Sequence, residues 1–365
     1  MRITRRRFTQ SALAAGAVGT AALSAPFVAR AADPLKVGFV YVGPIGDHGW
    51  SYQHDRGRLA VEEAYGDKVE TSFVENVSEG ADAERVINQL AATGHGMVFT
   101  TSFGFMNPTL KVAKRHPNVL FEHATGYKRA DNLATYAGRF YQGRTISGIL
   151  AAHVTKTNTI GYIASFPIPE VVRGIGAFTV AARRINPDLQ VRVVWVNSWY
   201  DPGKEADAAK ALVDQGADVL LQHTDSPAPI QVAEERGVKA VGQASDMSRF
   251  GPTAHMTAVI DDWAPYYIER VGMALDGSWA TGDTWGGFDS GMVKMADYNA
   301  NLPAEAVKDA QEAVAAITSG ERHSFDGPVK DQSGTVRIPE GEYMADEELL
   351  SMDWYVEGVQ GKLPG

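Results

Sequence analysis

Short apolar segments alternate with helix-periodic segments along most of this chain, in two successive series. The first series opens with a buried-type strand at residues 36–42 and a helical pattern at 50–65. The second opens with a strand at 159–165 and a helix at 170–185. Strands separated by helices at this spacing pair in parallel and are covered on both faces. The sequence therefore predicts an α/β fold with two doubly wound parallel-sheet lobes joined by a hinge.

The two series meet near residue 140, and the chain is expected to cross between the lobes again later. An apolar segment at 256–260 and a helical pattern at 263–275 would carry it back to the first lobe. The predicted domains are a signal segment at 1–31, lobe 1 at 32–140 and 258–280, and lobe 2 at 141–257 and 281–365.

Residues 1–31 have the pattern of an export signal. They carry Arg5-Arg6-Arg7, then an apolar stretch rich in small residues, and end in a small-x-small cleavage site. These features are typical of a twin-arginine signal peptide, which directs a folded protein across the inner membrane. A membrane anchor is the alternative, but Gly, Ser and Pro26 interrupt the apolar stretch, which is short for a span. We expect a mature chain in the periplasm.

Charge and cysteine content exclude several classes of function. Removing the arginines of the signal segment takes the formal net charge from −10 to about −15. An acidic chain without a basic block is a poor binder of nucleic acid and of anionic lipid. Cysteine is absent, so no disulfide forms and no lipid is attached at the cleavage site. The sequence predicts a freely diffusing, non-lipidated monomer without a nucleic-acid partner.

Aromatic and acidic residues recur directly after the predicted strands of both lobes. Open parallel sheets bind ligands beyond the carboxyl ends of their strands, so these residues are candidates for a shared cleft. Aromatic rings stack on a flat ligand, and carboxylates accept its N–H or O–H groups. Any one of these residues could equally pack the core or cap a helix, so the prediction rests on the recurrence of aromatic and acidic residues after several strands and not on any single residue. The candidates are Asp47, His48, Trp50, Phe103, Phe166, Trp199, Asp225 and Asp246.

Catalytic and cofactor signatures are missing from the sequence. It has no Gly-x-Ser-x-Gly elbow, no His-Glu-x-x-His motif, no P-loop and no cysteine nucleophile. Gly174-Ile175-Gly176 lacks the third glycine of a dinucleotide fingerprint, and the segment from Asp331 fails the later spacing of a calcium loop. The sequence therefore predicts no catalytic residue, no metal site and no cofactor.

Several segments together match one known family, although most are ordinary α/β segments singly. They are 43–51 (GPIGDHGWS), 103–105 (FGF), 142–144 (QGR) with 148–151 (GILA), 159–163 (TIGYI), 199–205 (WYDPGKE) and 216–219 (GADV). On these segments the chain resembles the basic membrane protein (Bmp) family of ABC-transporter substrate-binding proteins, whose best-described members bind purine nucleosides. The resemblance runs through most of the mature chain.

The resemblance implies a type I periplasmic-binding-protein fold, in which two hinged lobes close over a ligand. It also implies an importer partner, an ABC permease and ATPase complex in the inner membrane. On this resemblance Asp47 and Trp50 occupy the family's first binding loop, and Phe103 and Phe166 fall in the second and third. Asp246 lies where the family holds an acid that touches the base.

One segment departs from the family pattern and narrows the expected ligand. Nucleoside-binding members often carry a ribose-holding lysine in the segment that matches residues 258–262, whereas this chain has Asp261 and then Trp263. We therefore add Asp261 and Trp263 to the candidate ligand-binding residues. The departure favours a free purine base over a nucleoside, and another flat heterocycle such as riboflavin is an alternative.

Two other functions fit the same residues. A periplasmic nucleoside-processing enzyme would use Asp225 or Asp246 as the base and His48 as the acid. A receptor that feeds a sensor kinase instead of a transporter would have the same sequence features.

Overall fold

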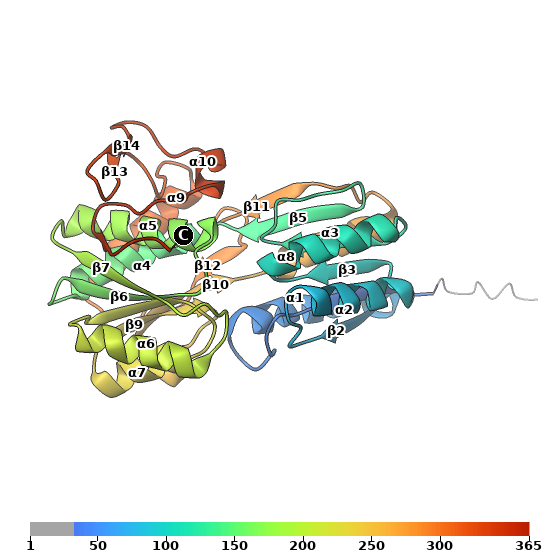
Figure 1. Ribbon diagram of the computed structural model, residues 1–365, viewed down its shortest axis with the longest axis horizontal. Helices are drawn as coiled ribbons and strands as arrows, with labels where there is room; N and C mark the ends of the chain where they lie inside the picture. The colour runs from blue at the N-terminus through green and yellow to red at the C-terminus, as the bar shows by residue number, and fades with distance from the viewer. Residues whose placement is uncertain (1–32, 365) are drawn as a thin grey trace, which may run out of the picture. The chain divides into compact units, whose positions relative to one another are not determined.

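A computed structural model describes residues 33–364, so the predicted signal peptide at 1–31 lies outside the described chain. The described residues form two lobes, each built on one large sheet with helices on both faces (Figure 1). The predicted α/β class with two doubly wound lobes is confirmed. Between residues 33 and 364 no helix is both long and apolar enough to cross a bilayer.

The sheet of lobe 1 has six strands, all paired in parallel. In spatial order they are β11 (Asp283–Gly286), β5 (Leu133–Gly138), β4 (Leu120–Ala124), β3 (Met97–Thr100), β1 (Leu35–Val40) and β2 (Val69–Val74). The helices of this lobe are α1 (Gly49–Tyr65), α2 (Ala81–Ala92), α3 (Met106–Arg115) and α8 (Ala264–Asp276).

The sheet of lobe 2 has seven strands, and β12 at one edge runs antiparallel to its neighbour. In spatial order they are β12 (Val293–Met295), β10 (His255–Asp261), β9 (Lys239–Ala244), β8 (Val219–His223), β6 (Thr159–Ala164), β7 (Gln190–Trp195) and β15 (Val359–Gln360). The helices of this lobe are α4 (Phe140–Val154), α5 (Pro169–Ile185), α6 (Pro202–Asp214), α7 (Ala228–Arg236) and α9 (Ala304–Thr318).

Residues of the central strands alternate between two hydrophobic cores in each lobe. In lobe 1, Val37 and Phe39 of β1 pack with α1 and α8, whereas Val40 packs with α2 and α3. In lobe 2, Tyr162 of β6 packs with α4 and α5, whereas Ile163 packs with α6 and α7. A strand that is covered on both faces needs a continuous apolar run, which explains why these segments read as buried strands.

The chain passes between the lobes at residues that differ from the expected ones. Residues 258–261 were assigned to lobe 1, but they belong to β10, which pairs with β9 in the second sheet because Met256 and Ala258 are buried there. Helix α8 packs in lobe 1, with Tyr267 in the core that it shares with α1. Strand β11, inside the segment assigned to lobe 2, pairs with β5 in the first sheet.

The last segment, from Phe325 on, covers lobe 2 (Figure 1). Met352 and Tyr355 are buried in the core of that lobe, and Trp354 is half-buried against it. The elements of this segment are β13 (Val329–Lys330), β14 (Val336–Ile338), α10 (Asp346–Leu350) and β15.

Candidate functional site

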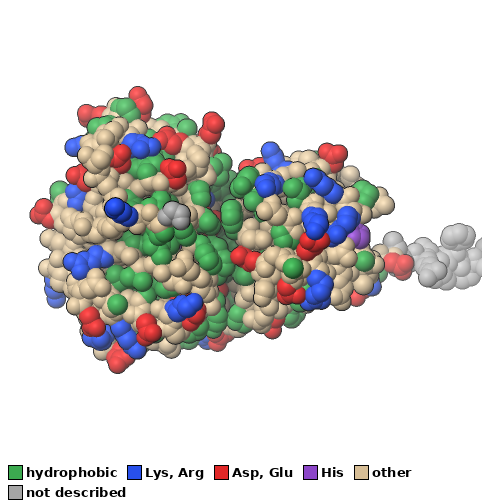
Figure 2. Space-filling view, viewed as in Figure 1, with side chains coloured by type: hydrophobic (Ala, Val, Ile, Leu, Met, Phe, Trp, Pro, Cys, Tyr) green, Lys and Arg blue, Asp and Glu red, His purple; other side chains and the backbone are tan. Residues whose placement is uncertain are grey.

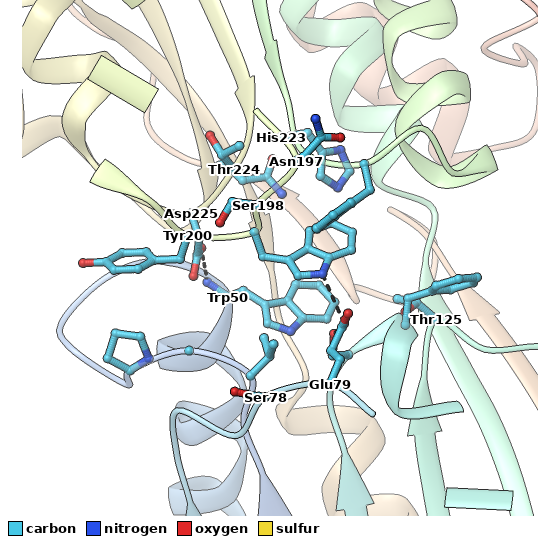
Figure 3. A pocket seen from close by; sticks show the side chains of 18 of the residues that line it. Trp50, Ser78, Glu79, Thr125, Asn197, Ser198, Tyr200, His223, Thr224 and Asp225 are labelled. Atoms are coloured by element: carbon cyan, nitrogen blue, oxygen red, sulfur yellow. Dashed lines mark hydrogen bonds between the residues drawn. The ribbon is translucent and has the colours of Figure 1, made fainter. Parts of the chain in front are cut away.

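A cavity of about 400 Å³ lies between the carboxyl ends of the two large sheets. Lobe 1 contributes the segments that follow β1, β2, β3 and β4, and lobe 2 contributes those around the ends of β6, β7, β8 and β9. Figure 3 shows side chains from both lobes around this cavity. Hydrophobic side chains also gather along the junction of the lobes on the face shown in Figure 2. The position is the one that open parallel sheets use for ligands.

Half of the predicted binding residues line the cavity, and most of these are aromatic. The rings of Phe166 and Trp199 have centroids 5.0 Å apart at an interplanar angle of 57°. The indole Nε1 of Trp50 donates to the carbonyl of Thr101 at 2.6 Å, which fixes its ring from lobe 1. The predicted residues that line the cavity are Trp50, Phe103, Phe166, Trp199 and Asp225.

Glu79, in the segment after β2, joins the two lobes at the cavity. Its Oε1 accepts a hydrogen bond from the Ser102 hydroxyl at 2.5 Å and another from the Gly104 N–H at 3.1 Å, both within lobe 1. The indole Nε1 of Trp199, from lobe 2, donates to the same oxygen at 3.2 Å (Figure 3). The Trp199 ring is therefore held in place by a hydrogen bond that crosses between the lobes.

Asp225 makes a second link between the lobes. Its Oδ1 accepts the Trp50 N–H in the first turn of α1 at 2.5 Å (Figure 3). Gly49 has a φ of +84°, and a Cβ at this position would lie 2.3 Å from Asp225 Oδ1, so glycine permits the close approach. The Gly49 N–H donates to Ser245 Oγ at 2.6 Å. Burial raises the pKa of the Asp225 carboxyl well above its ordinary value.

Five predicted binding residues lie outside the cavity lining, and three of them, Asp47, His48 and Asp246, lie in the loops after β1 and β9. Asp47 forms an ion pair with Arg249 across the lobes, and hydrogen bonds from Arg249 and His48 lower the pKa of Asp47 to about 2. The ring Nδ1 of His48 lies 2.8 Å from Asp47 Oδ1. Asp246 is exposed, and its Oδ1 accepts the N–H of Ser248 at 2.8 Å. The acid expected for an enzyme, His48, is therefore outside the cavity lining, although Asp225, one of the two expected bases, is part of it.

Asp261 and Trp263 lie in the interior behind the cavity lining. Asp261 is fully buried, neither of its carboxylate oxygens has a hydrogen-bond partner within residues 33–364, and burial raises its pKa. The ring of Trp263 stacks on that of His54 with centroids 4.6 Å apart, and only 1% of the residue is exposed. Trp263 therefore packs the core of lobe 1.

Several polar residues that line the cavity were not predicted. His223 is the last residue of β8, and its Nε2 lies 3.4 Å from Glu170 Oε1 in the first turn of α5. Burial lowers the pKa of this histidine. The sequence predicts strands at 217–224 and 239–244, so His223 and Gln243 fell inside predicted strands and were not selected, although both lie at strand ends, where ligands are expected. The polar lining residues without a prediction include Glu79, Glu170, Asn197, His223 and Gln243.

Three cavity-lining residues have an unusual backbone conformation. Asn76, Thr125 and Asn197 have φ values of 57°, 62° and 50°, and all three follow strands that point at the cavity. Asparagine tolerates this region, but a β-branched threonine adopts it at a cost. Strain of this kind collects at ligand-binding sites, where the surrounding structure imposes it.

Comparisons with known proteins agree with this geometry. A family described as ABC transporter substrate-binding protein PnrA-like (Bmp) matches residues 35–324. The purine-binding protein BAB2_0673 of Brucella abortus is 56% identical over 92% of this chain and 96% of its own length. A putative ABC transporter glucose-binding protein, TsgA13 of Haloferax volcanii, is 37% identical over 91% of this chain and 82% of its own.

Solved structures share the fold at low sequence identity. A solute-binding protein of an ABC transporter from Conexibacter woesei has a TM-score of 0.65 at 19% identity, covering 79% of this chain and 98% of that chain. Another from Aeropyrum pernix has a TM-score of 0.68 at 17% identity, covering 82% and 93%. These likenesses confirm the predicted type I periplasmic-binding-protein fold.

Proposed function

Because the chain belongs to the Bmp family of ABC transporter substrate-binding proteins, we propose that it is the periplasmic receptor of an importer and binds a purine-type ligand in the cavity between its lobes. The ligand is a free nucleobase in preference to a nucleoside. The observation that carries the proposal is the set of rings from both lobes, Trp50, Phe103, Phe166 and Trp199, around one cavity with carboxylates at its edge.

The ring set suits a planar heterocycle. Stacking of a base on an aromatic side chain is worth roughly 1–3 kcal/mol by alanine substitution and tolerates any base. Hydrogen bonds from the ligand to a carboxylate add about 1.5–3 kcal/mol each. The name of the Brucella abortus relative, a purine-binding protein, supports the same ligand class.

One feature favours a base without a ribose. The segment in which nucleoside-binding members of the family often hold a lysine instead carries the buried Asp261.

The family also supports the partner and the location. An ABC permease and ATPase complex would receive the ligand from a monomeric receptor. The signal segment supports export by the twin-arginine route, and the absence of cysteine supports a protein without a lipid anchor. We infer binding without turnover, since the histidine and acid expected for catalysis are not together at the cavity.

Calorimetric titration of the purified protein tests the proposal. The ligands are adenine, guanine, adenosine, riboflavin and glucose, the last because of the name of the Haloferax volcanii relative. We expect a purine base to bind most tightly and, at 100 times its Kd, to stabilise the fold by about 2.7 kcal/mol in a melting experiment. If no purine binds, or if glucose or riboflavin binds more tightly, the ligand assignment is wrong. Chromatography of the adenosine sample checks that the nucleoside stays intact.

A further inference from the structure

The cavity is acidic and has no cationic side chain in its lining. Among the described residues that line it, Glu79, Glu170 and Asp225 are carboxylates, and none is lysine or arginine. The charge of Glu170 is partly offset by Arg173, whose Nη2 lies 4.0 Å from one oxygen, and His223 Nε2 lies 3.4 Å from the other. Asp225 and Glu79 have no such partner within residues 33–364.

Each of these two carboxylates keeps one oxygen free of hydrogen-bond donors in the described chain. Asp225 uses Oδ1 for the Trp50 N–H, and Glu79 uses Oε1 for all three of its donors. Asp225 Oδ2 and Glu79 Oε2 therefore accept no hydrogen bond from the described residues. An acceptor that loses water without gaining a donor is costly, so a ligand that displaces water from these oxygens binds better when it brings an N–H or O–H group to each of them.

The two free acceptors meet different edges of a bound ring. Asp225 follows β8 in lobe 2 and Glu79 follows β2 in lobe 1, and Figure 3 shows them on either side of Trp50. A planar ring stacked among the indoles would therefore present one edge to Asp225 and another to Glu79. The ring nitrogen of a free base and an exocyclic amino group supply such donors, whereas a phosphate or an ionised ring would face carboxylates without any cation in the lining.

We propose that the cavity selects an uncharged, amino-substituted purine base, whose amino group and free ring N–H donate to Asp225 and Glu79, and that it excludes nucleotides and other anionic purines. This selectivity rests on the proposed function and adds to it the hydrogen-bonding pattern of the ligand. Asp225 thereby has two roles, with Oδ1 holding α1 and Oδ2 recognising the ligand.

Calorimetry with adenine, hypoxanthine, 9-methyladenine and AMP tests the proposed hydrogen bonds to each edge of the purine separately. Hypoxanthine replaces the amino group of adenine with a carbonyl oxygen, 9-methyladenine removes the ring N–H, and AMP adds a phosphate. We expect adenine to bind about tenfold or more tightly than hypoxanthine and than 9-methyladenine, since each loses one hydrogen bond to a carboxyl group of the lining and leaves its oxygen without a donor. AMP should give no measurable heat.

Two nearly isosteric variants show which edge of the purine contacts Asp225 and which contacts Glu79. Asp225→Asn and Glu79→Gln each keep an acceptor for the existing donors, so the links between the lobes survive. One variant should lose the preference for adenine over hypoxanthine, and the other should lose the preference over 9-methyladenine. Exposed Asp188 and Glu63, away from the cavity lining, provide the matched controls Asp188→Asn and Glu63→Gln, which should keep both ratios.

The outcomes separate the two proposals. Equal affinities of the unaltered protein for adenine, hypoxanthine and 9-methyladenine, or unchanged ratios in both cavity variants, overturn the selectivity while leaving purine binding intact. Binding of AMP as tight as that of adenine overturns the exclusion of anions. Absence of binding by every purine overturns the proposed function and this inference together.

Discussion

Replacing Phe166 by alanine tests the stacking that the proposed function requires. Phe166 follows β6, is half-buried, and lies at the cavity with its ring centroid 5.0 Å from that of Trp199. Trp50 is a poorer choice, because it packs edge-on against Trp263 at 5.4 Å and His54 at 4.4 Å inside lobe 1. Removing Trp50 would disturb the lobe as well as the site, whereas Phe166 reports mainly on the ligand.

The expected loss of affinity follows from stacking alone. One base–aromatic contact is worth roughly 1–3 kcal/mol, which corresponds to about a five- to 150-fold rise in the Kd of the Phe166→Ala variant. The fold should lose only the aromatic pair with Trp199, worth about 0.5–1.5 kcal/mol, plus a small amount of half-buried surface. Affinity should therefore fall more than stability.

Calorimetry with adenine and urea unfolding of the ligand-free variant measure the two effects separately. Tyr127→Ala is the control, since Tyr127 is 68% exposed and does not line the cavity. The Kd of this control should match that of the unaltered protein. A Phe166→Ala variant that unfolds normally and binds adenine with an unchanged Kd would refute the stacking. It would show that the ligand does not bind against Phe166.

Three further substitutions probe the link between the lobes and the interior of lobe 1. Gly49→Ala places a Cβ against Asp225 and strains a φ of +84°, so ligand affinity measured by calorimetry should fall by about 1–3 kcal/mol, and unchanged affinity would show that the link is dispensable. Burial lowers the pKa of His123 to about 3, so only the unfolded chain takes up this proton below about pH 6.5, and stability should fall as the pH drops. His123→Gln should reduce that slope in urea unfolding by up to about 1.4 kcal/mol per pH unit, and an unchanged slope would contradict the buried neutral ring. Glu122→Gln leaves the buried Arg270, whose Nε donates to Glu122 at 2.5 Å, without its counter-charge, so the free energy of unfolding should drop by about 3–5 kcal/mol, and a fully stable variant would disprove the importance of the pair.

The sequence predicted the elements well because their signals are local. The pattern of the sequence predicts a helix at 228–236 and a strand at 239–244, since an apolar period, Gly237 and an apolar run mark them, and α7 and β9 have these bounds in the structure. Ser78 has the side chain of a helix N-cap, so the sequence predicts a helix at 78–92, but α2 begins at Ala81, because Gly80 precedes it with a φ of +91°. The crossing points of the chain were harder to predict. Nothing local in β10 shows which sheet it joins, and β11 is a four-residue strand with a weak pattern, since it contains Asp283 and Thr284.

Only part of the site was predicted from the sequence, because the sequence does not show which residues of a loop face the cavity. The strand-end rule selects a loop but not the side of the loop that faces the cavity. Asp47 and Trp50 share the loop after β1, yet Trp50 lines the cavity while Asp47 pairs with Arg249, which lies in the other lobe and far along the sequence. No local pattern reveals such a partner. Glu79 was missed for the same reason, because its three donors come from distant segments.

The residues at the strand ends serve two purposes at once, and this limits what affinity alone can reveal. Asp225 and Trp199 line the cavity and also make hydrogen bonds between the lobes. A substitution that weakens a link between the lobes lowers the population of the binding-competent arrangement and so raises the apparent Kd without touching the ligand. Such a variant lowers the affinity for every ligand by the same factor, whereas loss of a direct contact changes the ratio between two ligands that differ at one edge. Ratios such as adenine to hypoxanthine therefore distinguish a residue that recognises the ligand from one that only holds the lobes together. Asp225→Asn keeps the acceptor for the Trp50 N–H and should change a ratio without a uniform loss of affinity, whereas Asp225→Ala removes both oxygens and should change the ratio and the overall affinity together.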